Sequence, residues 1–117
     1  MKIELTDTKK ACFMVGYITK IAETKNKKYH DQLKETLHDK NKMDKTLLNK
    51  VYTNSIIALT DAMADKADDT IDDLCEYTTS LLLAADNIDF KFNVMYYYTL
   101  GYTSKAARLV DNDIIID

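Results

Sequence analysis

The 117-residue sequence contains no proline and only two glycines, Gly16 and Gly101. Because these two residue types provide most backbone turns, their scarcity argues against collagen-like repeats, extensive disorder and a turn-rich β-sandwich. The longest purely apolar runs, 11–15 and 81–85, fall far short of the roughly 18 residues that a membrane span needs. Acidic Glu4 and Asp7 are untypical of a secretory signal. We therefore predict a cytoplasmic protein that does not cross a membrane.

Cysteine and arginine are scarce as well. Cys12 and Cys75 each lie in an apolar stripe at helical spacing, far apart and without a Cys-x-x-Cys pair. We interpret both as reduced, buried side chains and not as a disulfide or a zinc site. Arg108 is the single arginine beside fifteen lysines. Lys, Asn, Ile and Tyr are abundant, as A/T-rich codons produce, which fits an A/T-rich bacterium, a phage or a large DNA virus as the source. We expect a phage or mobile-element origin.

What the chain does contain is helical periodicity, with 46% hydrophobic and 30% charged residues. Apolar side chains recur every three or four positions in four stretches, as in amphipathic helices. Phe13 and Tyr17 add a second apolar pair to the first stretch, so that helix should lie centrally, and Gly16 would permit a close approach there. The expected helices cover about 6–22, 23–39, 44–65 and 70–85.

Helix starts are also predicted. Asp44 has the features of an N-cap, with Met43 packing on Leu48. Thr70, with Asp73 three residues later, resembles an acidic variant of the capping box and places a break at 66–69. One continuous helix through Ala85 is the alternative.

The segment from Ile88 to Tyr98 is ambiguous, because it alternates like a strand yet also fits a helix that begins at Asn87 or Asp89. We favour the helix, with Gly101 as the residue that ends it and a short last helix from Thr103 or Ser104 to Val110. The prediction is an all-α protein, a compact bundle of four to six helices in one domain over residues 1–117. Minor β pairing at the termini remains open.

Charge is unequally distributed along the chain. Residues 1–59 hold 12 basic and 7 acidic groups, a balance of +5, whereas residues 60–117 hold 4 basic and 12 acidic groups, a balance of −8. Opposite charges on two halves can attract within one molecule or between copies. We therefore expect a homo-oligomer.

One acidic cluster suggests a metal site. Four carboxylates fall at steps of four, three and four on one helical face, a spacing that can hold Mg²⁺. The arrangement resembles the paired acidic motifs of all-α nucleotide pyrophosphohydrolases of the MazG kind, which implies Mg-dependent nucleotide cleavage. Aspartates stand here where those enzymes have glutamates, and first-turn acidic residues also stabilise a helix through its dipole. The four are Asp65, Asp69, Asp72 and Glu76.

The C-terminal sequence from Tyr98 to Val110 is similar to the turn and second helix of a helix-turn-helix. That resemblance implies DNA binding, with Thr103 as helix cap and Lys105 and Arg108 toward the DNA. Tyr97 departs from it, because the motif has a small residue four positions before the glycine.

No motif reaches the specificity that an enzyme assignment needs. Elimination therefore favours a non-enzymatic regulatory protein that needs no cofactor and binds a protein partner, with the helix-turn-helix and the Mg-dependent enzyme as alternatives. The narrow stripe on the polar second helix and the tyrosine-rich segment are the candidate interaction surface. Its residues are Tyr29, Leu33, Leu37, Tyr97 and Tyr98.

Overall fold

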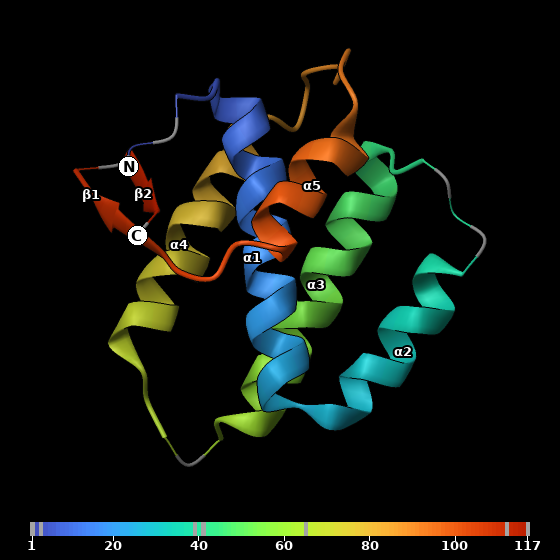
Figure 1. Cartoon of the computed structure of the whole chain (residues 1–117), viewed down its shortest axis with the longest axis vertical. Helices are drawn as coiled ribbons and strands as arrows, with labels where there is room; N and C mark the ends of the chain where they lie inside the picture. The colour runs from blue at the N-terminus through green and yellow to red at the C-terminus, as the bar shows by residue number, and fades with distance from the viewer. Residues whose placement is uncertain are drawn as a thin grey trace.

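A computed structural model describes residues 2, 4–38, 40, 42–64, 66–111 and 113–116. Five helices and a two-stranded antiparallel sheet follow one another along the described chain (Figure 1). The predicted helical bundle with minor β pairing at the termini is confirmed. The elements are α1 (Asp7–Lys25), α2 (Lys27–Leu37), α3 (Lys45–Ala62), α4 (Asp69–Ala84), α5 (Val94–Tyr102), β1 (Ala107–Val110) and β2 (Asp113–Ile116).

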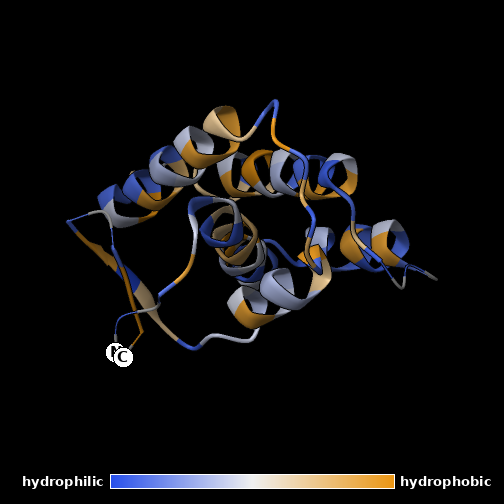
Figure 2. Ribbon diagram, turned by 90° about the horizontal axis from the view of Figure 1, so that it is seen from above, coloured by the Kyte–Doolittle hydropathy of each residue, from blue (hydrophilic) through white to orange (hydrophobic). Residues whose placement is uncertain are grey.

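Helix α1 lies at the centre, with the other helices and the hairpin around it (Figure 1). Its stripe through Val15 and Ile18 joins a buried cluster with α2, α3 and α5. Phe13 and Met14 face a second cluster, formed with Leu74 of α4 and the hairpin. Hydrophobic and hydrophilic residues alternate around the helices, as amphipathic packing requires (Figure 2). The predicted central position of this helix is thus confirmed.

Two aspartates cap the long helices. The Asp44 carboxylate accepts a hydrogen bond from the backbone N–H of Leu47 at 2.7 Å, which confirms the predicted start of α3. The break between α3 and α4 is confirmed too, but the prediction of Thr70 as the cap is wrong. Asp68 caps α4 by accepting from the backbone N–H of Ile71 at 3.1 Å, because a carboxylate two residues earlier reaches the free N–H groups of the first turn.

The two glycines meet where α1 crosses α5. A Cβ atom on Gly16 would lie 1.9 Å from the carbonyl oxygen of Tyr98, and one on Gly101 would lie 1.8 Å from the carbonyl oxygen of Phe13. Both positions therefore require glycine for backbone contact, as predicted for Gly16. The prediction that Gly101 ends the helix is wrong, because α5 continues to Tyr102 and no glycine has a positive φ.

The ambiguous segment is helical only in its second part. Residues 88–93 are in neither a helix nor a strand, and α5 begins at Val94 with the Asn93 side chain accepting from the backbone N–H of Tyr96 at 3.2 Å. Both the strand over 88–94 and the helix start at Asn87 or Asp89 are thus corrected. The rings of Phe90 and Phe92 stack on each other, with 5.3 Å between their centroids.

The predicted last helix is replaced by the β1–β2 hairpin, in which Ala107 pairs with Ile116 and Val110 with Asp113. Asp111, in the turn, has a φ of 50°, a left-handed conformation that aspartate tolerates in tight turns. The backbone N–H of Ala107 donates to the Tyr17 hydroxyl at 3.0 Å and ties the hairpin to α1. Near the N-terminus, Lys2 forms a single β-bridge with Ile115.

Across the described residues, none of the helices is long and apolar enough to cross a membrane.

Candidate interaction site

The predicted stripe on α2 faces inward. Tyr29 and Leu33 are buried, and Leu37 packs partly buried against the same cluster. The Tyr29 hydroxyl lies 2.7 Å from Ser55 Oγ and donates to the carbonyl oxygen of Val51 at 3.2 Å, so it is held by α3. The three side chains of this stripe therefore pack against the core of the same molecule.

The two predicted tyrosines of α5 are covered to different degrees. Tyr98 is buried between α5 and the main cluster, and burial raises the pKa of its hydroxyl well above the usual range. Tyr97 is half-buried and contacts Phe92 edge-on, with Lys9 Nζ 5.2 Å from its ring centroid. Of the five predicted surface residues, three are thus buried within the chain, whereas Leu37 and Tyr97 keep part of their side chains accessible.

The proposed metal ligands do not converge among the residues that the structure describes. Asp69, Asp72 and Glu76 are exposed on α4, and Asp65 lies outside the described residues. Within the described ranges, no three His, Cys, Asp or Glu side chains come together as metal ligands. Asp69 and Asp72 occupy the first turn of α4, where negative charge interacts favourably with the helix dipole. The Mg-dependent enzyme stays a prediction.

The helix-turn-helix geometry is wrong for this segment. Thr103 is the C-cap of α5 and donates through Oγ1 to the carbonyl oxygen of Thr99 at 2.8 Å. Lys105 follows in a bend, and Arg108 lies in β1 opposite Ile115, where the second helix was expected. The physical cause is strand pairing with β2, which a local helical pattern cannot report.

A hydrophobic groove separates the C-terminal part of α3 from the start of α4. Its volume is about 580 Å³. Cys75 is half-buried in its wall, and burial together with nearby Asp72 raises the pKa of the thiol to about 11. The same cause, burial, raises the pKa of Cys12 in the core to about 12. The groove is lined by Ile56, Leu59, Thr60, Met63, Ala64, Lys66, Ala67, Ile71, Asp72 and Cys75.

A second unusual surface is the outward side of α5, here called the α5 face and composed of Tyr96, Thr99, Leu100 and Thr103. All four side chains are exposed, with Tyr96 at 55% and Leu100 at 40%. Helix α5 carries no charged residue along its length. Tyr96 and Leu100 thus form a short apolar ridge at i, i+4 spacing, with the two threonines beside it.

The chain segments that contain the groove and the α5 face carry opposite net charge, although the groove lining itself holds one charge of each sign, Lys66 and Asp72. Residues 60–76 contain seven acidic groups and one lysine, whereas residues 91–105 contain two lysines and no acidic group. Lys9 adds a third positive charge beside α5, over Phe92 and Tyr97. Helices α4 and α5 lie on different sides of α1 (Figures 1 and 2), so one molecule presents the two surfaces in different directions.

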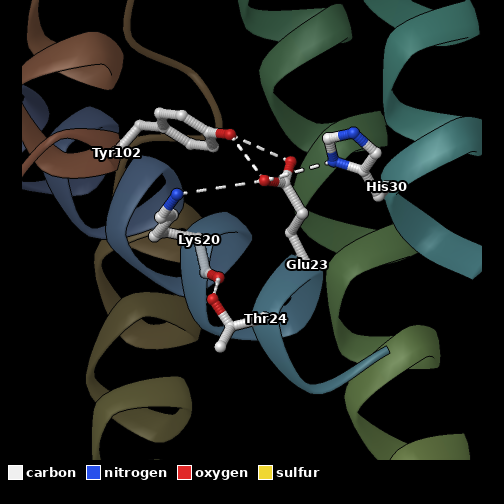
Figure 3. Close-up of polar contacts among 5 residues, drawn as sticks. All are labelled: Lys20, Glu23, Thr24, His30 and Tyr102. Carbon is white, nitrogen blue, oxygen red and sulfur yellow. Dashed lines mark hydrogen bonds and ion pairs between the residues drawn. The ribbon is translucent and has the colours of Figure 1, made fainter. Parts of the chain in front are cut away.

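A polar cluster centred on Glu23 joins three helices (Figure 3). The Tyr102 hydroxyl donates to both carboxylate oxygens, at 2.8 and 2.9 Å. His30 Nδ1 lies 3.4 Å and Lys20 Nζ 3.9 Å from the same carboxylate. Burial, followed by the negative Glu23, raises the pKa of Tyr102 to about 12. The cluster therefore holds α1, α2 and α5 together, with Tyr102 protonated at neutral pH.

Sequence reasoning missed the groove. Two features of the sequence could have indicated it. Ile56 widens the apolar stripe of α3, and the small apolar residues Ala64 and Ala67 lie near the α3–α4 break. Comparisons with known protein families, curated proteins and solved structures found no match to this chain.

Proposed function

We propose that this chain is a non-enzymatic interaction protein whose α3–α4 groove receives a short apolar helix flanked by positive charge. The observation that carries the proposal is the groove itself, an apolar depression in the most acidic part of the chain. Amphipathic helices commonly bind in such grooves through residues at i and i+4. Acidic surroundings favour a partner helix with lysines at its ends.

The partner that fits this description is a second copy of the chain. The α5 face offers Tyr96 and Leu100 at the required spacing, between Lys91 and Lys105. Because groove and face lie on different sides of α1, association would be head to tail, and each added copy would leave one free groove and one free face. The surfaces are small, so we expect weak, salt-sensitive association.

Two variants test this geometry by breaking one surface each. The groove variant combines Thr60→Lys and Asp72→Lys, which place positive charge at the groove. The face variant combines Tyr96→Glu and Leu100→Glu. Wild-type protein should grow in mass with concentration in sedimentation velocity at low salt, whereas each variant alone should remain a monomer.

Mixing the two variants provides the decisive measurement. The intact α5 face of the groove variant should bind the intact groove of the face variant, and growth should stop at a dimer. Ile57→Glu is a matched control, because Ile57 is 55% exposed on α3 outside the groove. A wild-type monomer at high concentration, or variants that associate alone but not together, would contradict the proposal.

Cys75 gives an independent readout within the groove. Its thiol should react slowly with iodoacetamide below its pKa of about 11, and faster as pH rises. Docking of a second copy would cover it, so the alkylation rate should fall as wild-type concentration rises. The groove variant should show no such concentration dependence.

A further inference from the structure

A separate depression, here called the lysine hollow, lies where the C-terminal half of α1 meets the segment after α5. Its volume is about 600 Å³. Lysines project from both sides of it: Lys20 and Lys25 belong to α1, and Lys105 follows α5. Tyr17 and Tyr102 add aromatic surface, and Ser104 closes the lining near the chain bend.

The hollow has positive charge without a matching negative group in its lining. No carboxylate side chain is among the described residues that line it. Lys20 pairs with the Glu23 carboxylate at 3.9 Å, so the charges of the hollow without an ion-pair partner among the described residues are those of Lys25 and Lys105. Lys25 and Lys105 form no ion pair with any described residue. The ends of α1 and α5 contribute only partial negative charge, which the lysines exceed.

A free hydrogen-bond donor accompanies this charge. The Ser104 hydroxyl is buried and has no hydrogen-bond partner among the described residues. The neighbouring Thr103 hydroxyl, in contrast, is satisfied by the carbonyl oxygen of Thr99. A buried hydroxyl without a partner is unfavourable, and an incoming anion oxygen would satisfy it.

We propose that the lysine hollow binds a small molecule bearing a diphosphate or triphosphate group. Several lysines around one depression suit a multiply charged anion better than a single carboxylate, because each phosphoryl group needs its own countercharge. Ser104 donates to a phosphoryl oxygen, and Tyr17 adds aromatic surface for an apolar or planar part of the ligand. The Tyr102 ring is already in contact with Lys20, whose Nζ lies 4.9 Å from the ring centroid. The hollow shares Thr103 and Lys105 with the edge of the α5 face, but the proposal does not depend on association between copies.

Isothermal titration calorimetry with pyrophosphate, ATP, AMP and inorganic phosphate at fixed ionic strength tests the proposal. Pyrophosphate and ATP should bind saturably and more tightly than AMP and inorganic phosphate. The double variant Lys25→Ala/Lys105→Ala should weaken pyrophosphate binding at least tenfold. The matched control, Lys27→Ala/Lys28→Ala on the exposed start of α2, removes the same charge outside the hollow and should change affinity less than twofold.

A third variant separates ligand contact from general charge. Ser104→Ala removes a buried hydroxyl without a partner, so the melting temperature should stay the same or rise while pyrophosphate affinity falls severalfold. Lack of saturable pyrophosphate binding by the wild type would overturn the proposal. Equal losses in the hollow variant and the control variant would also overturn it, because they would indicate binding by net charge alone.

Discussion

The α1–α5 junction and the attachment of α2 hold their helices in opposite ways. At the junction, Gly16 and Gly101 bring backbone against backbone, with no room for even a methyl group. Helix α2 instead packs through two buried side chains, Tyr29 and Leu33, on a narrow stripe against α3. The first contact depends on the absence of side chains and the second on their size.

This difference sets how each contact responds to change. Side chains in an apolar stripe can shift rotamers and partly fill a lost volume, whereas two helix backbones in contact can only move apart as rigid bodies. A substitution at the junction should therefore affect the whole core through α1, which faces both buried clusters. A substitution on α2 should be felt mainly at that edge of the molecule.

The largest effect should come from Gly16→Ala. The added Cβ would lie 1.9 Å from a backbone oxygen of α5, so the helices must separate. We expect a loss of about 3 kcal/mol or more in the free energy of unfolding, at or above the usual range for overpacking and only partly offset by the better helix propensity of alanine. Chemical denaturation monitored by circular dichroism measures it.

Thr99→Ala is the control for this substitution, because Thr99 is exposed on α5 and alanine there adds only helix propensity. Its unfolding free energy should stay within about 0.5 kcal/mol of wild type. Wild-type stability in Gly16→Ala would show that α1 and α5 are not in backbone contact, and the contrast with α2 would disappear.

The same contrast explains what the sequence could predict. The spacing of apolar residues predicted helices α1 to α4, and the capping pattern at Asp44 predicted the start of α3. Both patterns involve only residues that are close together in the sequence. Gly101 was misassigned as a helix end because its role depends on α1, which is far away in the chain. The local sequence pattern alone cannot distinguish a glycine that ends a helix from one that allows another helix to pack closely against it.

The C-terminal error has a similar cause. Ala107 to Val110 suits a helix by composition and becomes a strand only through pairing with Asp113 to Ile116. A two-residue connection of Asp and Asn between apolar runs was the available hairpin signal. For the candidate site, the sequence indicated the charge imbalance, but the groove and the lysine hollow required the relative placement of separate helices.

The next effect in size concerns α2. Leu33→Ala removes a side chain that is 5% exposed, and we expect a loss of about 2 kcal/mol, at the low end of large-to-small core substitutions because an edge site can relax. Hydrogen exchange should show the largest increase in α2 and little in α1 or α5. A uniform increase over all helices would mean that α2 is as integral to the core as α5.

A smaller effect should follow Tyr29→Phe. The ring stays in place, but the hydroxyl no longer reaches Ser55 Oγ and the carbonyl oxygen of Val51. Ser55 still donates to the same carbonyl at 2.8 Å, so no backbone acceptor is left without a partner. We therefore expect about 1 kcal/mol, the typical net value of one hydrogen bond, from thermal unfolding. A loss as large as that of Leu33→Ala would show that polar contacts, and not side-chain volume, attach α2.

The smallest effects concern the start of α4, where contact with α1 is made by side chains and the cap is local. Asp68→Ala removes the acceptor for the backbone N–H of Ile71 and should cost about 1 kcal/mol or slightly less, because Asp68 is only partly buried. Thr70→Ala should cost no more than a few tenths of a kcal/mol, since Thr70 lies exposed inside the first turn and alanine favours the helix. Asp69→Asn, which removes only a charge near the helix dipole, should have an effect between those of the other two variants.

Thermal unfolding of the three variants side by side tests this order. If Thr70→Ala proved the most costly, Thr70 would be the N-cap of α4, as the capping pattern in the sequence predicts. The hydrogen bond from the backbone N–H of Ile71 to Asp68 would then not define the start of the helix.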